Sequence, residues 1–227
     1  MIIMKNSKKK IISIGNYKVL DVLQSNDEKD IFHVQDLKNH SKEYTLRILK
    51  SNQNPKQIDT EIEILNRLNP YSETLNFQKL EIFSDKLLFI FDYSKGKDLL
   101  SLYNENKNFF DNQILKIFVK DLVRILEIYK ENNILHGNIK PENIIFNGEQ
   151  FYLIGLSKAR FTDVKDQKED IISLVSVLYF LLTGEHYYEE LMLSGNIDKG
   201  LSNIIGECLK DKKELDLNKL RNYIDKI

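Results

Sequence analysis

Hydrophobic and polar positions alternate differently in the first and second parts of the chain, and this difference predicts two structural regions. In the first part, β-branched and aromatic residues gather in short runs bounded by polar residues, which is typical of strands. The predicted strands are Tyr17 to Leu23, Asp30 to Asp36, Glu43 to Lys50, Gln78 to Phe83 and Lys86 to Tyr93. In the third strand, Tyr44, Leu46 and Ile48 fall on one face and Thr45, Arg47 and Leu49 on the other.

One helix interrupts these strands. Pro55 is suited to the first turn of a helix, and Asn69-Pro70 ends the helical pattern. The predicted apolar stripe of this helix is Ile58, Ile62, Leu65 and Leu68. The expected order of elements in the first part is therefore β-β-β-α-β-β.

The second part is mainly helical and follows a short polar connection at Ser94 to Lys97. Asp111 is expected to cap a long helix, because a side-chain oxygen there can accept a hydrogen bond from the first turn. The apolar face of that helix is Ile114, Phe118, Leu122, Ile125 and Tyr129. The later elements are predicted to be strands at Ile144 to Phe146 and Phe151 to Ile154, a helix from Asp170 to Thr183 ended by Gly184, and helices at Leu201 to Leu209 and Leu217 to Ile227.

These patterns divide the chain into four stretches, namely a basic N-terminal extension at 1–16, a strand-rich region at 17–93, a connection at 94–97 and a helical region at 98–227. The lysine-rich residues Lys5 to Lys10 are interpreted as a solvated tail rather than a binding arm.

Composition excludes several classes of function. The chain has 33 basic and 34 acidic side chains and a net charge of −1, so no overall field favours nucleic acid or an anionic membrane. The most apolar run, Ile171 to Leu182, is too short to span a bilayer. A single cysteine, Cys208, is expected to be a buried core residue and fits a reducing compartment. We therefore expect a cytoplasmic protein that binds neither nucleic acid nor membrane.

A polar loop with a rigid proline lies between two apolar segments at His136-Gly137-Asn138-Ile139-Lys140-Pro141-Glu142-Asn143. This segment, the 136–143 loop, resembles the catalytic loop of protein kinases, which reads H-R-D-x-K-P-x-N. The resemblance extends from about Tyr17 to the C-terminus. It implies a two-lobed α+β fold with a small β-rich N-lobe containing one helix and a mainly helical, shortened C-lobe. The competing interpretation is an unrelated α+β domain with a chance Lys-Pro-Glu-Asn turn.

Compared with the kinase family, the chain departs at the positions that carry the chemistry. The resemblance puts Asn138 at the position of the catalytic aspartate, Gly155 at that of the metal-binding aspartate, and Arg47 at that of the strand lysine. A neutral amide cannot act as a general base, and loss of a base typically costs on the order of 10² to 10⁴ in rate. There is no glycine between Gly15 and Gly96, so the family's phosphate-binding glycine loop is missing.

Other positions match the family and allow two interpretations each. Arg47 and Glu61 match the lysine–glutamate pair that holds phosphates, or they form a structural ion pair. Lys140 and Asn143 match the phosphate-contacting and metal-binding residues, or they hold the loop by hydrogen bonds. These four residues form the candidate vestigial nucleotide site, and we predict no metal ligand set.

The resemblance also implies residues that stabilise the fold. His136, Leu65, Leu80 and Leu156 are expected to form a stacked internal column, and Asp170 to fasten the 136–143 loop. Gly137 replaces the arginine that would contact a phosphorylated activation segment, so that regulatory contact is expected to be lost.

The sequence thus predicts a pseudokinase, a regulatory module that binds a protein partner, with no cofactor expected. One alternative is a divergent phosphotransferase or nucleotidyltransferase that uses ATP and weakly bound Mg²⁺, with Asp163 or Asp166 as the acid. Another is nucleotide binding without turnover. The partner is not identified by the sequence; Tyr187 to Glu190 is one candidate surface.

Overall fold

The computed structural model describes residues 2–4, 11–50, 54–162, 168–184 and 220–222. These residues form two compact units, one from Met1–Asp59 with Leu75–Lys95 and one from Thr60–Thr74 with Gly96–Ile227. The lysine-rich patch at 5–10, Asp163, Asp166, the Tyr187 to Glu190 stretch, the predicted helix at 201–209 and Cys208 lie outside the described residues. Of the predicted helix at 217–227, the described residues 220–222 are helical.

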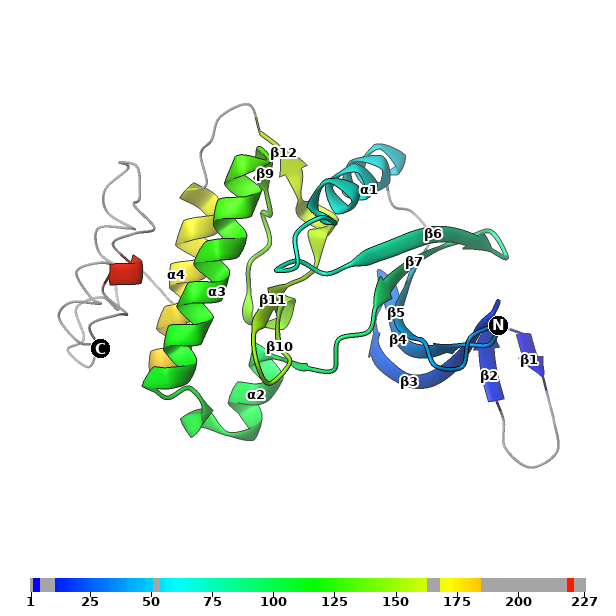
Figure 1. The fold of residues 1–227 in the computed structure, drawn as a ribbon, viewed down its shortest axis with the longest axis horizontal. Coiled ribbons are helices and arrows are strands. Elements are labelled where there is room, and N and C mark those ends of the chain that lie inside the picture. Colours follow the sequence, from blue (N-terminus) through cyan, green and yellow to red (C-terminus); the bar gives the residue numbers. More distant parts are fainter. Residues whose placement is uncertain (1, 5–10, 51–53, 163–167, 185–219, 223–227) are drawn as a thin grey trace. The chain divides into compact units, whose positions relative to one another are not determined.

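The first unit is built on a single antiparallel sheet, which curls in Figure 1. The strand order is β1-β2-β3-β4-β5-β7-β6. The strands are β1 (Ile2–Met4), β2 (Ile11–Ile14), β3 (Tyr17–Ser25), β4 (Lys29–Asp36), β5 (Glu43–Leu49), β6 (Phe77–Phe83) and β7 (Lys86–Asp92). The five strands expected from the sequence are confirmed within two residues at each end. The extension predicted at 1–16 contains two strands, β1 and β2, which add to the sheet beside β3.

Alternation along the strands separates two faces of this sheet. One face carries the predicted apolar set Tyr44, Leu46 and Ile48, which packs with partners from the neighbouring strands. The other face carries Thr45 and Arg47 from the same strand. The core cluster on the first face is Tyr17, Val34, Tyr44, Leu46, Ile48, Leu88 and Ile90. Burial of this face therefore determines the register of the sheet.

The curl brings distant strands of the sheet together. The Tyr17 hydroxyl on β3 donates a hydrogen bond of 3.1 Å to Oε1 of Glu81 on β6. Lys79 lies 2.6 Å from the same carboxylate oxygen. Burial raises the pKa of Tyr17, which keeps the hydroxyl protonated as the donor. This cluster joins two strands that are not neighbours in the sheet.

Helix α1 (Pro55–Leu68) begins at the predicted proline, and the boundary between the units falls within it. Asn54 caps the helix, since its side-chain oxygen accepts a hydrogen bond of 3.0 Å from the Lys56 N–H. The predicted stripe is partly wrong, because Ile58 and Ile62 are only half-buried. The buried positions are Glu61, Ile64, Leu65 and Leu68. Both sets have helical spacing, so only the tertiary contacts select between them.

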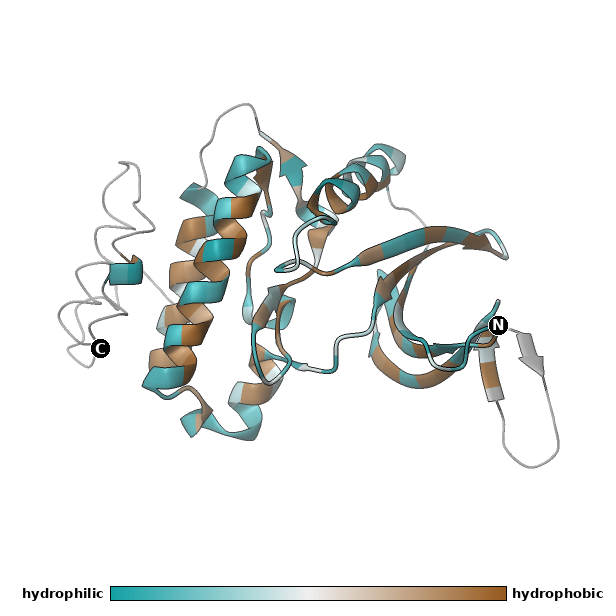
Figure 2. Cartoon of the chain, in the orientation of Figure 1, coloured by the Kyte–Doolittle hydropathy of each residue, from teal (hydrophilic) through white to brown (hydrophobic). Residues whose placement is uncertain are grey.

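Besides the end of α1, the described residues of the second unit include the helices α2 (Leu99–Glu105), α3 (Asn112–Glu131) and α4 (Lys168–Thr183). Asp111 caps α3 as predicted, accepting a hydrogen bond of 2.9 Å from the Ile114 N–H. Helix α4 ends at Thr183 and is followed by Gly184, whose positive φ of 75° suits a glycine after a helix. Helix α2 is not predicted by the sequence pattern. Figure 2 shows hydrophobic residues around most of α4, whereas α3 has a distinct polar face.

Short strands connect these helices. They are β8 (Lys97–Asp98), β9 (Ile134–Leu135), β10 (Ile144–Phe146), β11 (Phe151–Leu153) and β12 (Arg160–Phe161). Strands β10 and β11 confirm the two predicted there, and β11 is held against α3 by a bond of 2.9 Å from the Phe151 N–H to the Asp121 carboxylate. Among the described helices, none combines the length and apolar character that a membrane span requires.

Candidate functional site

The 136–143 loop lies between β9 and β10 in the second unit. Its last residues form a short 3₁₀ turn, Pro141–Asn143, whose proline occupies the first position of the turn. The Ile139 side chain is buried and anchors the centre of the loop. The loop is therefore shaped by an apolar anchor and a rigid proline, with polar groups on either side.

Asp170, near the start of α4, holds the beginning of this loop. Its Oδ2 accepts a hydrogen bond of 2.7 Å from the His136 N–H, and its Oδ1 accepts one of 2.8 Å from the Gly137 N–H. The Asp170 side chain is fully buried. Burial raises the pKa of Asp170 to about 6, although the two backbone hydrogen bonds favour the ionised form. The loop and α4 are thus joined by a buried carboxylate.

His136 is a buried bridge within the loop. Its Nε2 lies 3.0 Å from the Ile154 carbonyl oxygen, and its Nδ1 accepts a hydrogen bond of 3.2 Å from the Asn138 N–H. These two partners match the neutral tautomer with the proton on Nε2. Burial lowers the pKa of His136 to about 4, so the ring is neutral near pH 7. The geometry places His136 as a hydrogen-bonding support rather than an exposed acid or base.

Asn143 also bonds within the loop. Its side-chain Nδ2 donates a hydrogen bond of 2.8 Å to the Asn138 carbonyl oxygen. Its own carbonyl oxygen accepts one of 2.8 Å from the Ile154 N–H. A Cβ added at Gly155 would lie 2.7 Å from the Asn143 Oδ1. The Asn143 amide therefore lies directly against the glycine that the resemblance places at the metal-binding aspartate.

Lys140 differs from its neighbours because its side chain is about half exposed. Its Nζ lies 3.9 Å from Oε1 of Glu142, which is a loose and solvent-screened ion pair. The Lys140 carbonyl oxygen accepts a hydrogen bond of 2.9 Å from the Asn143 N–H. The backbone of Lys140 thus shapes the turn, while its ammonium group faces solvent.

The remaining predicted residues are divided between the two units. Arg47 in the first unit is buried, with its guanidinium carbon 4.2 Å from the Phe89 ring centroid. Leu80 is a half-buried residue of the same unit. Glu61, Leu65 and Leu156 are buried residues of the second unit. The predicted Arg47–Glu61 pair and the internal column each need residues from both units, so both stay predictions.

Two residues beside the loop were not singled out from the sequence, Arg160 and Glu169. The Arg160 Nη2 lies 2.5 Å from the Glu169 Oε2. Arg160 Nη1 would be 2.9 Å from a Cβ added at Gly137. The glycine in the loop was the available signal, because a missing side chain leaves room for another residue.

The loop positions that the resemblance assigns to the base and to the metal ligands carry no carboxylate in this chain. Mg²⁺ prefers carboxylates together with phosphate oxygens and water. At the relevant positions the chain offers Asn138, Asn143 and Gly155, of which none carries a carboxylate. Within the described part of the chain, no group of three or more His, Cys, Asp or Glu residues is arranged to hold a metal.

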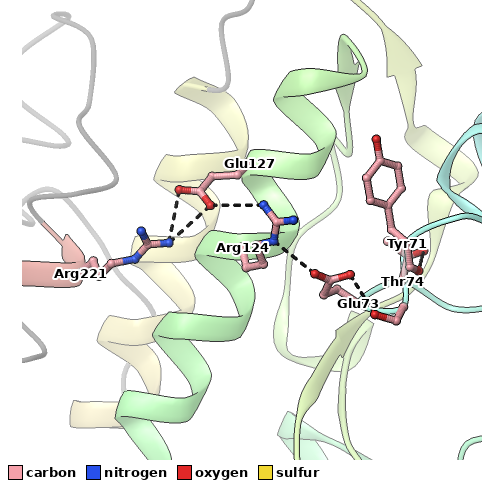
Figure 3. Close-up of polar contacts among 7 residues, drawn as sticks. Tyr71, Glu73, Thr74, Arg124, Glu127 and Arg221 are labelled. Carbon is pink, nitrogen blue, oxygen red and sulfur yellow. Dashed lines mark hydrogen bonds and ion pairs between the residues drawn. The ribbon is translucent and has the colours of Figure 1, made fainter.

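A charged network supports the segment that follows α1 within the second unit (Figure 3). Arg124 on α3 donates from Nε to the Glu73 carboxylate at 3.2 Å, and its Nη1 lies 3.9 Å from Glu127. Arg221 lies 3.3 Å from the other Glu127 oxygen. Nearby, the Asn132 side chain donates a hydrogen bond of 3.0 Å to the Tyr71 hydroxyl. Residues 71–74 are therefore tied to α3 through side chains.

The curled antiparallel sheet, the single helix inserted between its strands and the aspartate-clamped loop define a kinase-like α+β fold. Residues 25–163, more than half of the chain, match the family model described as "Protein kinase domain". The chain belongs to the protein kinase domain family.

Several curated kinases are similar to the chain. It is 30% identical over 121 residues to the human putative 3-phosphoinositide-dependent protein kinase 2, covering 50% of this chain and 30% of that protein. It is 29% identical over 138 residues to rat 3-phosphoinositide-dependent protein kinase 1, covering 56% and 24%. It is 22% identical over 200 residues to the Caenorhabditis elegans serine/threonine-protein kinase sgk-1, covering 85% and 41%. The chain spans less than half of the length of each of these relatives.

Proposed function

We propose that this kinase-family domain acts as a pseudokinase, a regulatory module that binds another protein and does not transfer phosphate. One observation carries the proposal, namely the contact between Asn143 and Gly155. The Asn143 amide donates to the loop backbone and lies against Gly155, where an added Cβ would be only 2.7 Å from the Asn143 Oδ1. A carboxylate side chain at position 155 would require this amide to move away from its present place.

The environment of Asn138 supports the same proposal. Its backbone N–H donates to His136 Nδ1, and its carbonyl oxygen accepts from the Asn143 side chain. Both backbone groups hold the loop in shape, while the side chain is a neutral amide. An amide at the position of the base can orient a hydroxyl group but cannot accept its proton. The loop keeps its hydrogen-bonded shape in the absence of the aspartate.

A divergent phosphotransferase or nucleotidyltransferase is the alternative, and the exposure of Lys140 favours it. The ammonium group is half exposed and only loosely paired with Glu142, at 3.9 Å. Because this ion pair is weak, the ammonium group can turn towards an anionic ligand such as a phosphate. The alternative also requires an acid outside the described residues, such as Asp163 or Asp166.

Transfer of labelled phosphate or nucleotide from ATP separates the two functions. The purified chain is incubated with ATP labelled at the α or γ position, with Mg²⁺ or Mn²⁺ and candidate acceptor proteins. The pseudokinase proposal predicts no labelled product above the level of a heat-denatured sample. The matched control for Lys140→Ala is Lys120→Ala, which removes an exposed lysine on α3. Sustained labelling that is lost in Lys140→Ala but kept in Lys120→Ala would overturn the proposal.

Nucleotide binding without turnover is tested by thermal unfolding. A ligand present far above its Kd stabilises the folded state by a few kcal/mol, which raises Tm by several degrees. Without binding we expect a shift of less than about 1 °C at millimolar ATP. A larger shift that Lys140→Ala abolishes would assign nucleotide binding to the loop, and the regulatory role would then include ATP as a bound ligand.

A further inference from the structure

The turn at His136 and Gly137 depends on a side chain from another element. Gly137 has a positive φ of 66°, and its N–H donates to Asp170. A Cβ at this position would lie 2.9 Å from Arg160 Nη1 and 3.1 Å from the Lys158 carbonyl oxygen. A Cβ carbon cannot form a hydrogen bond and does not normally lie closer than about 3 Å to another heavy atom in a packed structure. The end of the Arg160 side chain therefore lies in the space that a Cβ at position 137 would take, and it would have to shift to admit one.

Arg160 reaches this place from β12. This strand pairs with β9, and Arg160 lies opposite Leu135, the residue before His136. The guanidinium Nη2 donates to Glu169 Oε2 at 2.5 Å. Glu169 immediately precedes Asp170 on α4. The Arg160–Glu169 ion pair therefore joins the strand beside the loop to the same first turn of α4 that binds the loop through Asp170.

We propose that Arg160 is a positioning residue for the 136–143 loop. Together with Glu169 it fills the place beside Gly137 and holds the His136–Gly137 turn on the Asp170 carboxylate. The resemblance to kinases places an arginine at position 137 itself, whereas this chain supplies the guanidinium from β12. The order of the turn then depends on an ion pair within the chain and requires neither a bound ligand nor a phosphorylated segment.

The charges around Asp170 agree with this arrangement. Burial is the main cause that raises the pKa of Asp170; the negative charge of Glu169 adds to the rise, and the positive charge of Arg160 opposes it. Tyr129 also interacts electrostatically with Asp170, and its ring lies 6.0 Å from that of His136, whose backbone N–H donates to Asp170. Because His136 is neutral near pH 7, Arg160 is the cation that favours the ionised, hydrogen-bonding form of Asp170. Loss of the Arg160 charge should therefore weaken the clamp most at mildly acid pH.

The first test measures amide hydrogen exchange at His136 and Gly137 by NMR, without nucleotide. Arg160→Gln and Glu169→Gln are each expected to speed the exchange of both amides about two- to five-fold, as for an exposed ion pair. The reversed pair, Arg160→Glu with Glu169→Arg, should restore slow exchange, and 1 M salt should remove the difference between wild type and the Gln variants. As the pH is lowered, the hydrogen bonds to Asp170 should begin to weaken at a higher pH in Arg160→Gln than in the wild type.

A similarly exposed ion pair provides the control. Lys97 and Glu105 are separated by 2.6 Å, and each side chain is 55% exposed. Lys97→Gln and Glu105→Gln should leave the exchange of the two loop amides unchanged. If the Arg160 and Glu169 variants behave like these controls, the proposal is wrong. The measurement does not involve phosphate transfer, so its result is separate from that of the proposed function.

The second test asks whether Arg160 fills the space beside Gly137. Gly137→Ala should be destabilising, and part of its effect should disappear when Arg160 is changed to Gly. The control is Gly148→Ala, because Gly148 also has a positive φ, of 104°, but its added Cβ would meet no atom within 4 Å. Gly148→Ala should therefore be insensitive to Arg160→Gly. Additive effects of Gly137→Ala and Arg160→Gly on unfolding would contradict the proposed contact.

Discussion

The side chain of Asp170 and the backbone of His136, 34 residues apart in the sequence, are joined by a buried hydrogen bond of 2.7 Å. The same carboxylate binds the Gly137 N–H at 2.8 Å. A single side chain thus satisfies two successive backbone donors at the start of the loop. This relationship makes the loop dependent on α4 for its shape, and it leads to the first two predictions.

Replacement of Asp170 by Asn should destabilise the protein. The Asn side chain can accept one of the two backbone hydrogen bonds, and its NH₂ group then faces the second N–H. Loss of a buried hydrogen bond to a charged group, with a donor left unsatisfied, costs about 2 to 3 kcal/mol. Urea unfolding measures this change. Asp121→Asn is the control, because half-buried Asp121 accepts a single backbone hydrogen bond, from Phe151, and should cost less. Equal losses in the two variants would contradict the double role of Asp170.

The stability of the protein should contain two opposing contributions between about pH 4 and 6.5. The pKa of His136 is lowered from 6.5 to about 4, so below pH 6.5 the unfolded chain binds a proton that the folded protein does not bind. This stabilising contribution, about 3 kcal/mol at full size, is lost as the pH falls towards 4. The pKa of Asp170 is raised from 3.8 to about 6, so its contribution is present at low pH and is lost as the pH rises through 6.

Unfolding free energies at several pH values separate these contributions. Asp170→Asn lacks the contribution of Asp170, so its stability should fall more steeply than that of the wild type as the pH is lowered from 6.5 to 4.5. His136→Gln lacks the opposite contribution and should lose less stability than the wild type over the same range. Parallel pH profiles for all three proteins would show that neither buried group titrates as proposed.

Substitutions of Gly155 should reveal the contact with Asn143. Gly155 has a positive φ of 86°, and a Cβ there would lie 2.7 Å from Asn143 Oδ1. Gly155→Ala is therefore expected to cost the backbone strain of about 1 to 3 kcal/mol and an additional steric term. Gly148→Ala carries a positive φ without the steric term and should cost less. We also expect Gly155→Asp not to restore phosphate transfer, and appearance of transfer in this variant would contradict the proposed obstruction.

The charged network of Figure 3 should contribute little to the free energy of unfolding, whereas the buried hydroxyl of Thr74 beside it should contribute more. Glu73→Gln breaks a half-exposed ion pair with Arg124 and should cost less than about 1 kcal/mol, an effect that 1 M salt removes. Thr74→Val removes a hydrogen bond of 2.8 Å to the Leu68 carbonyl oxygen, and the Thr74 side chain is buried. This loss, about 1 to 2 kcal/mol, should be independent of salt. Thermal unfolding at low and high salt distinguishes the two.

Much of the fold could be predicted from local patterns. Alternation places Tyr44, Leu46 and Ile48 on the buried face of β5, and the start of α1 at Pro55 and the cap of α3 at Asp111 follow from residue chemistry alone. The buried face of α1 could not be predicted in full, because two sets of residues share the same helical period. Short elements such as β1, β2 and α2 depend on a neighbouring surface, which a local pattern does not contain.

Likewise, part of the candidate site could be predicted from the sequence and part could not. The order of residue types in the 136–143 loop, with His136, Lys140, Pro141 and Asn143 at set positions, was sufficient to indicate the protein kinase family, because that order is a property of the chain itself. The tertiary structure alone decided that Asn143 lies against Gly155 and that Arg160 fills the space beside Gly137. These contacts join segments separated in the sequence, and they arise only when strands and helices pack and exclude other side chains from the same volume.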